Sequence, residues 1–137
     1  MKRFVLVLLL VLGVFATSAS AAPKQVSIVI QHQTRGCHSW AVGVNGTQKV
    51  VLRVSITTGS TLKFVNNDVM PQKIVKKSGA KVVFLSKANL SKPAATVKVV
   101  FTKAGVYTFG TVAGEDYAKG ITTVGEDNVL KLVVTVK

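Results

Sequence analysis

The chain has 137 residues, with 18 basic and 5 acidic side chains and a formal charge of +13. This length fits one domain, and a single cysteine excludes a scaffold built on disulfides within the chain. The positive charge favours anionic partners, either cell-envelope components such as polymers and lipid headgroups or an acidic redox protein. No aromatic platform is interleaved with the lysines, so nucleic acid is not an expected partner.

The N-terminal segment has the pattern of a secretory signal peptide. Lys2 and Arg3 precede an apolar run, residues 4–15, which is too short to span a membrane comfortably, and small residues follow up to Ala21. We expect cleavage after Ala21, because a cut one residue later would place Pro23 beside the scissile bond. The expected product is an exported, periplasmic or extracellular domain of residues 22–137. It would be a monomer with no transmembrane segment and a formal charge of +11, from 16 basic and 5 acidic side chains.

The rest of the chain is rich in short β-type segments separated by turn signals such as Asn45-Gly46 and Ser78-Gly79. No helical period of ten residues is present, and residues 86–95, which include Pro93, are expected to form a loop with at most one helical turn. The pattern predicts an all-β domain, an antiparallel Greek-key sandwich or barrel of seven to nine strands. The expected strands are residues 25–31, 49–57, 61–65, 81–85, 96–102, 106–111 and 129–136.

The stretch GCHSW, residues 36–40, contains the only cysteine, one of the two histidines and the only tryptophan. Cys37 and His38 are candidate metal ligands, but unpaired cysteines are often small buried hydrophobic residues. Neighbours on a strand point to opposite faces, so the two could bind one ion only if the strand begins after Cys37. In an earlier-starting strand, His38 would share a face with Trp40, which would then fill the core.

All five carboxylates lie in connecting segments, outside every expected strand. They would form an acidic pole if these segments meet, and clustered carboxylates need a nearby cation. One candidate is Ca²⁺, held by these carboxylates with Asn67 or Asn128, although no D-x-D-x-D-G loop is present. Alternatively, these residues are simply good turn and loop formers. The carboxylates are Asp68, Glu115, Asp116, Glu126 and Asp127.

The run FVNNDVMPQKIV, residues 64–75, resembles the strand-loop-strand of the cupredoxins, in which the first copper-ligating histidine follows the proline. The run AGVYTFGT, residues 104–111, resembles the cupredoxin strand that delivers the ligating cysteine, and residues 129–136 resemble the closing strand. This resemblance implies a cupredoxin-like fold. Gln72 and Thr111 stand where the histidine and cysteine would be, so the usual type 1 copper site is not expected to form.

The chain is also similar to a set of exported cupredoxin-like proteins that share four short motifs. They are G-C-H-x-W, D-V-M-P-H, G-E-D-Y and G-E-D-N. This sequence keeps the first, third and fourth, and has Gln72 in place of the histidine of the second. The similarity implies export and this fold rather than a particular activity.

The resemblance implies that residues 68–72 and 111–128 lie at one end of the sandwich. Cys37 and His38 would join them if the turn at residues 34–36 lies at that end, and His32 is close enough in sequence to contribute. Thiolate, imidazole and thioether suit copper, above all Cu(I), and a glutamine is an acceptable weak axial ligand. We therefore expect copper binding or copper handling at Cys37, His38, Met70 and Gln72. The alternative is a metal-free binding module that attaches to anionic envelope partners through its lysines.

An enzymatic role is not expected. No Ser-His-acid or Cys-His-acid arrangement can be read from the spacing of the residues. A cysteine and histidine adjacent in sequence are also poorly placed for general-base activation, because that step requires facing side chains.

Overall fold

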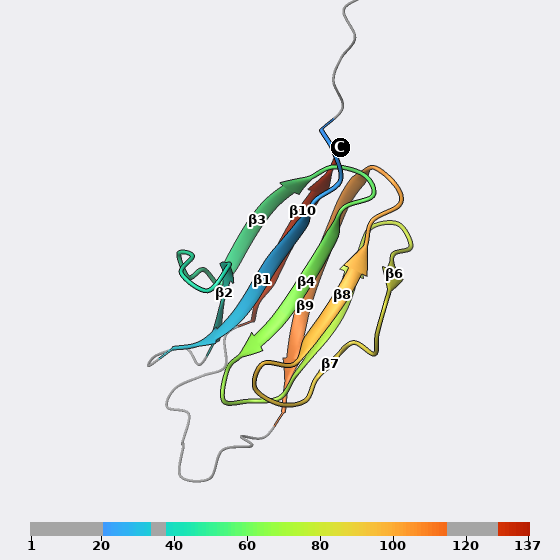
Figure 1. The fold of residues 1–137 in the computed structure, drawn as a ribbon. Coiled ribbons are helices and arrows are strands. Elements are labelled where there is room, and N and C mark those ends of the chain that lie inside the picture. Colours follow the sequence, from blue (N-terminus) through green and yellow to red (C-terminus); the bar gives the residue numbers. More distant parts are fainter. Residues whose placement is uncertain (1–20, 34–37, 115–128) are drawn as a thin grey trace, which may run out of the picture.

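The computed structural model describes residues 21–33, 38–114 and 129–137, which form a sandwich of two β-sheets (Figure 1). Ten strands are described, five in each sheet, and two of them contain only two residues. In the described part of the chain, no helix is long and apolar enough to cross a membrane. The strands are β1 (Gln25–His32), β2 (His38–Val42), β3 (Val51–Ile56), β4 (Thr61–Asn67), β5 (Gln72–Ser78), β6 (Val83–Phe84), β7 (Asn89–Leu90), β8 (Thr96–Val100), β9 (Gly105–Ala113) and β10 (Lys131–Val136).

The first sheet has the strand order β2-β1-β4-β8-β6, and the second sheet has the order β3-β10-β9-β5-β7. Most neighbouring strands are antiparallel, but β1 runs parallel to β4 and β3 runs parallel to β10. The chain passes from one sheet to the other between β2 and β3, and again between β3 and β4. These crossings bring strands of the same direction side by side, as parallel pairing requires. The expected all-β sandwich is confirmed. The expectation of an antiparallel sandwich of seven to nine strands is wrong in two respects, because two pairs are parallel and ten strands are described. Three of the ten, β2, β5 and β7, lie outside the strands expected from the sequence.

Alternation of buried and exposed residues builds the core between the sheets. In β4, Leu62 and Phe64 are buried, whereas the residues that follow each of them, Lys63 and Val65, are only half-buried. This alternation is the period of two expected in a strand. Within the first sheet, Trp40 packs against Phe64, with ring centroids 6.0 Å apart. Phe64 in turn packs against Phe109 of the second sheet, with ring centroids 5.8 Å apart. The reading of Trp40 as a core residue is therefore confirmed.

The parallel pairing of β1 with β4 gives the sandwich two different ends. At one end, Thr58 N–H donates to the carbonyl of Lys137, and the Thr57 hydroxyl donates to the carbonyl of Ala22. The first described residues and the C-terminal strand therefore meet there (Figure 1). The opposite end carries His32, the last residue of β1, and Asn67, the last residue of β4.

The segment expected to be a loop, residues 86–95, is mostly irregular. It contains the two-residue strand β7, in which Leu90 pairs with Gln72 at the start of β5. This short pairing places Leu90 in the core beside the end of the sandwich that carries His32.

Candidate functional site

Two histidines face each other across the pair formed by β1 and β2. His32 and His38 are register partners, and residues 33–37 connect their strands. His38 lies two residues before Trp40, so the alternation that buries Trp40 also turns His38 toward the core. The His38 side chain is only 2% exposed, whereas that of His32 is 31% exposed and lies at the rim.

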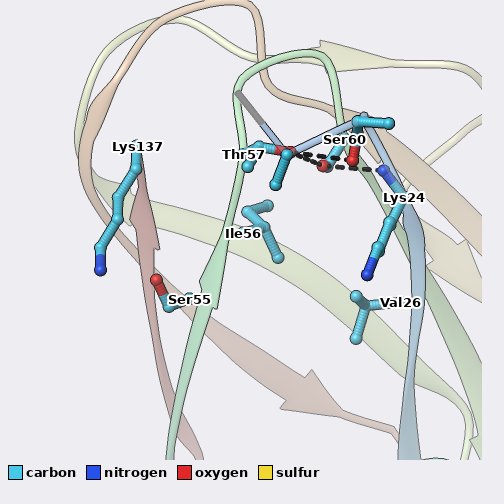
Figure 2. Close-up of a pocket in the computed structure, with 9 residues that line it drawn as sticks. Lys24, Val26, Ser55, Ile56, Thr57, Ser60 and Lys137 are labelled. Carbon is cyan, nitrogen blue, oxygen red and sulfur yellow. Dashed lines mark hydrogen bonds between the residues drawn. The ribbon is translucent and has the colours of Figure 1, made fainter. Parts of the chain in front are cut away.

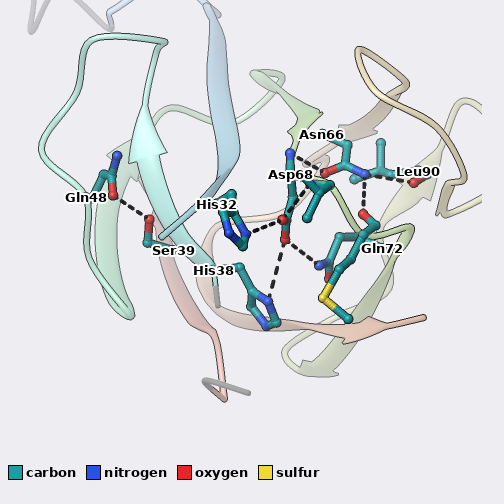
Figure 3. Close-up of polar contacts among 10 residues, drawn as sticks. His32, His38, Ser39, Gln48, Asn66, Asp68, Gln72 and Leu90 are labelled. Atoms are coloured by element: carbon teal, nitrogen blue, oxygen red, sulfur yellow. Dashed lines mark hydrogen bonds and ion pairs between the residues drawn. The ribbon is translucent and has the colours of Figure 1, made fainter. Parts of the chain in front are cut away.

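The segment between β4 and β5 is held in place by Asn66. The side-chain oxygen of Asn66 accepts a hydrogen bond from Asp68 N–H, and its Nδ2 donates to the carbonyls of Met70 and Leu90 (Figure 3). Asn66 is fully buried, so its amide satisfies backbone groups that water does not reach. These bonds fix the direction of the Asp68 side chain.

The carboxylate of Asp68 is fully buried and is surrounded by hydrogen-bond donors. Its Oδ1 accepts from Val69 N–H at 2.7 Å and lies 3.2 Å from His32 Nδ1. Its Oδ2 accepts from Gln72 Nε2 at 3.0 Å and lies 3.6 Å from His38 Nδ1, which is too long for a hydrogen bond (Figure 3). A buried carboxylate is costly unless it is paired and hydrogen-bonded, and these neighbours meet that requirement.

The position of Asp68 determines which imidazole nitrogens are available for other chemistry. When Nδ1 of a histidine donates to a carboxylate, the lone pair of the neutral ring is on Nε2. A carboxylate behind the imidazole is a common arrangement for metal-ligating histidines, since it fixes the tautomer and ring orientation. Asp68 therefore has the geometry of a group that orients histidines rather than of a metal ligand.

Gln72 contributes a polar atom with no obvious structural role. Its side chain is 2% exposed, and its Nε2 donates to Asp68. Its Oε1 is also buried, and no hydrogen-bond partner for it is present among the described residues. Leaving such an acceptor unsatisfied costs about 1–3 kcal/mol, so this atom needs an explanation beyond packing.

The other residues predicted to form a metal site are distributed as follows. Met70 is buried in the segment between β4 and β5, at the same end as His38 and Gln72. Cys37, Glu115, Asp116, Glu126 and Asp127 lie outside the described residues. Gly114, which precedes the acidic segment, donates its N–H to the carbonyl of Pro71 and so lies at this end. Asp68 is the only described member of the predicted acidic pole. Its two oxygens face His32, Val69 and Gln72, which makes it poorly suited to Ca²⁺.

The donor set does not fit a type 1 copper site. Thr111 lies on β9 and Gln72 begins β5, and neither supplies the thiolate or imidazole that such a site requires. In residues 21–33, 38–114 and 129–137, no three His, Cys, Asp or Glu side chains are grouped so that they could hold a metal ion.

Two hollows lie on the surface of the described structure. One adjoins the candidate site and is lined by residues that include Gln72, Lys73, Asn89 and Val112. The other lies at the opposite end, where Lys24, Ser60 and Lys137 surround it (Figure 2). Its internal hydrogen bonds join Ser60 Oγ to Lys24 N–H and to the Thr57 hydroxyl, and its lining includes no histidine, cysteine or carboxylate side chain.

No family model matches the chain, and no curated protein matches it significantly. Several solved structures are similar to it at low sequence identity. One is a purple cupredoxin from Nitrosopumilus maritimus, at 19% identity and a TM-score of 0.44, covering 81% of this chain and 98% of that protein. Another is amicyanin from Paracoccus versutus, at 16% identity and a TM-score of 0.41, covering 88% of this chain and 86% of amicyanin.

Proposed function

We propose that the protein binds copper, for storage or transfer, through a site that differs from the type 1 centre. The ligands would be Cys37 and His38, with His32, Met70 and Gln72 as further donors, and Asp68 would orient the imidazoles. The observation that carries the proposal is the approach of Nδ1 of both histidines to the one buried carboxylate. Bound copper would supply redox chemistry or a metal for delivery to a partner.

The two histidines are suited to the role because their backbones are fixed. Both are on paired strands, so the distance between the rings is set by the sheet rather than by a flexible loop. A metal-binding group on a strand or helix is held more accurately than one on a loop. The contact between His32 Nδ1 and Asp68 then leaves Nε2 as the lone-pair nitrogen of the neutral His32 ring.

Cys37 supports the choice of copper. It precedes His38 directly in the sequence. Thiolate ligands favour Cu(I) over hard cations such as Ca²⁺. The buried Oε1 of Gln72 adds a weak metal ligand of the kind found at axial positions in copper proteins.

The test is a titration of the protein with Cu(I) and with Cu(II), in competition with a chelator of known affinity. The chain contains one cysteine and two histidines, and all three are proposed ligands. No further cysteine or histidine can therefore replace a ligand that has been removed. We expect the double variant Cys37→Ala, His38→Ala to lose at least 100-fold in Cu(I) affinity. Trp40, the only tryptophan, lies two residues from His38 and gives a second signal, because bound Cu(II) should quench its fluorescence.

A matched control removes a polar group near the site without removing a proposed ligand. Ser39→Ala serves, because Ser39 lies between His38 and Trp40 and its hydroxyl donates to Gln48 rather than to the site. This variant should bind copper as the unmodified protein does. Equally weak binding by the unmodified protein and the double variant would remove the copper hypothesis.

We also propose that this binding takes place outside the cytoplasm, without catalysis and with the protein as a monomer. The basic start, apolar run and small residues up to Ala21 support export. N-terminal sequencing of the exported protein should begin at Ala22. A product that retains residues 1–21 would contradict the proposed cleavage.

A further inference from the structure

The charged side chains on the described surface are all lysines, apart from Arg53. The described ranges contain thirteen lysines and Arg53, and Asp68 is their only side-chain carboxylate. Asp68 is buried, so none of these cations forms a surface ion pair with a described acidic side chain. The net charge of +13 produces a field that attracts anions, and its range is set by the ionic strength.

Four of the cations lie on the outer side of the second sheet, a surface that we call the basic face. In β3 the exposed Arg53 follows the buried Leu52, and in β10 the exposed Lys131 precedes the buried Leu132, so both cations point away from the core. In β5, the buried Gln72 and Ile74 flank the outward Lys73. The basic face consists of Arg53, Lys73, Lys77 and Lys131.

Gly110 on β9 leaves room on the basic face for the side chain of Lys77. The side chain of Lys77 lies over Gly110, with its Cε 3.3 Å from where a Cβ would be. The register of β9 with β10 places Lys131 beside the same glycine, since Leu132 pairs with Phe109. Lys77 and Lys131 therefore both add positive charge to the part of the basic face around Gly110, which favours an anionic partner.

Aliphatic side chains separate the cations of the basic face. Val51 and Val112 are about half exposed, and Val112 is the register partner of Lys73. Val106 is exposed on the same side of β9. Among the described residues, this surface therefore combines positive charge with small apolar side chains and has no aromatic residue.

The outer side of the first sheet is different. Part of it is covered by the segment after β2, because Gly43 N–H donates to the carbonyl of Ser27 and Gln31 Nε2 donates to the carbonyl of Val44. Val29 points outward from β1 but is only 1% exposed. The lysines in the strands of the first sheet are Lys63 on β4 and Lys98 on β8, which are register partners.

We propose that the basic face binds the surface of a bilayer that contains anionic phospholipids. Lysines interspersed with aliphatic side chains match phosphate groups above a hydrocarbon layer, and each cation near such a surface contributes to binding. A protein partner is less well matched, because protein interfaces are depleted in lysine and their binding hot spots are enriched in tryptophan and tyrosine. This inference does not depend on copper.

The test compares two double variants with equal loss of charge. Lys73→Gln, Lys131→Gln removes half of the basic face, and Lys63→Gln, Lys98→Gln removes two cations from the opposite side. Binding of the full chain is measured by co-sedimentation with vesicles of phosphatidylcholine alone and of phosphatidylcholine mixed with phosphatidylglycerol. Binding to the neutral vesicles measures the contribution of the apolar residues 4–15. This contribution is the same for every variant, because none of them changes that segment.

We expect the basic-face variant to bind the anionic vesicles about 30-fold more weakly, since each cation contributes roughly a factor of five. The opposite-side variant should lose threefold at most. Lys73→Arg, Lys131→Arg should bind as the unmodified protein does, which separates charge from any change in folding. Binding should also fall as salt shortens the Debye length from about 30 Å to about 8 Å.

Three results would overturn the proposal. The first is an equal loss in the two double variants, which would mean that the net charge alone attracts the protein. The second is equal binding to neutral and anionic vesicles. The third is binding to soluble polyphosphate without binding to anionic vesicles, which would identify a polymer rather than a bilayer as the partner.

Discussion

His32 and His38 occupy paired positions on β1 and β2, and each has its Nδ1 nearest to a different oxygen of Asp68, at 3.2 and 3.6 Å. Asp68 is 36 residues after His32 and follows β4, the neighbour of β1 on the other side. One buried carboxylate therefore links three segments of the first sheet at one end. This link stabilises the end of the sandwich whether or not a metal is bound.

The variant Asp68→Asn tests this link. An asparagine keeps the size of the side chain, and its oxygen can still accept a hydrogen bond from Val69 N–H. Its amide NH2 group, however, would face a nitrogen of either His32 or Gln72 and could not accept a hydrogen bond from it. Mispairing of a buried polar group costs about 1–3 kcal/mol, so we expect the free energy of unfolding to fall by that amount. Urea denaturation measures the change, with an unaltered slope as a check of two-state behaviour.

The control for this variant is Asn67→Ala, at the exposed neighbouring position. Exposed substitutions usually change stability by no more than about 0.5 kcal/mol. If Asp68→Asn and Asn67→Ala are equally stable, the carboxylate does not hold these segments together.

Gly79 is required by both its backbone and its surroundings. Its φ is +97°, and a Cβ there would lie 2.7 Å from Tyr107 Cδ1 and 2.8 Å from the carbonyl oxygen of Val106. Gly43 is a matched control, because its φ is +69° but no atom lies within 4 Å of its Cβ position. We expect Gly43→Ala to cost about 1–2 kcal/mol for the left-handed backbone alone, and Gly79→Ala to cost clearly more. Equal losses in thermal or urea unfolding would show that Tyr107 moves aside without cost.

The sequence predicts the strands better than it predicts how they pair. Alternation is local, so β4 and β10 can be recognised from residues such as Leu62-Lys63-Phe64. Pairing depends on contacts between distant segments, and nothing in β1 alone indicates that it runs parallel to β4. The burial of Val29 is unexpected for the same reason, because this residue points outward from β1 and yet is only 1% exposed.

The candidate site was predictable only in part. The resemblance to cupredoxins placed Asp68, Met70 and Gln72 at one end, and all three lie there. The contact between His32 and Asp68 joins residues 36 positions apart, and the burial of Gln72 Oε1 depends on the packing of β5 against β7 and β9. Such contacts are set by the tertiary fold, and neither composition nor spacing indicates them.

Trp40 should be the residue whose truncation most weakens the first sheet. It is fully buried, contacts Phe64 with a tilted ring, and has its backbone bonded to Lys49 in both directions. Trp40→Ala should lower the free energy of unfolding by about 3–5 kcal/mol, because it removes apolar contacts and leaves a cavity. Val44→Ala, at a position that is 68% exposed, is the control and should change it by less than about 0.5 kcal/mol. A loss below about 1 kcal/mol for Trp40→Ala would contradict a tightly packed core at this position.

Gln72→His tests the relation between this site and that of the copper-binding cupredoxins. The substitution places an imidazole directly after Pro71, on a buried position that already faces Asp68. If the copper proposal holds, Cu(II) affinity should rise at least tenfold, since imidazole is a far stronger copper ligand than an amide oxygen. No intense blue colour should appear, because Thr111 supplies no thiolate from β9.

Gln72→Leu is the matched control, because it fills a similar volume without any donor atom. It should leave Cu(II) affinity unchanged or slightly lower, and it should show how much the amide contributes. A second variant, Gln72→His with Thr111→Cys, adds a thiolate on a strand position that pairs with Ile74, two residues from the new imidazole. We expect a thiolate-to-copper absorption band only in this double variant. Equal Cu(II) affinities for Gln72→His and Gln72→Leu would place the copper ligands away from β5 and restrict the site to the end of β1 and the start of β2.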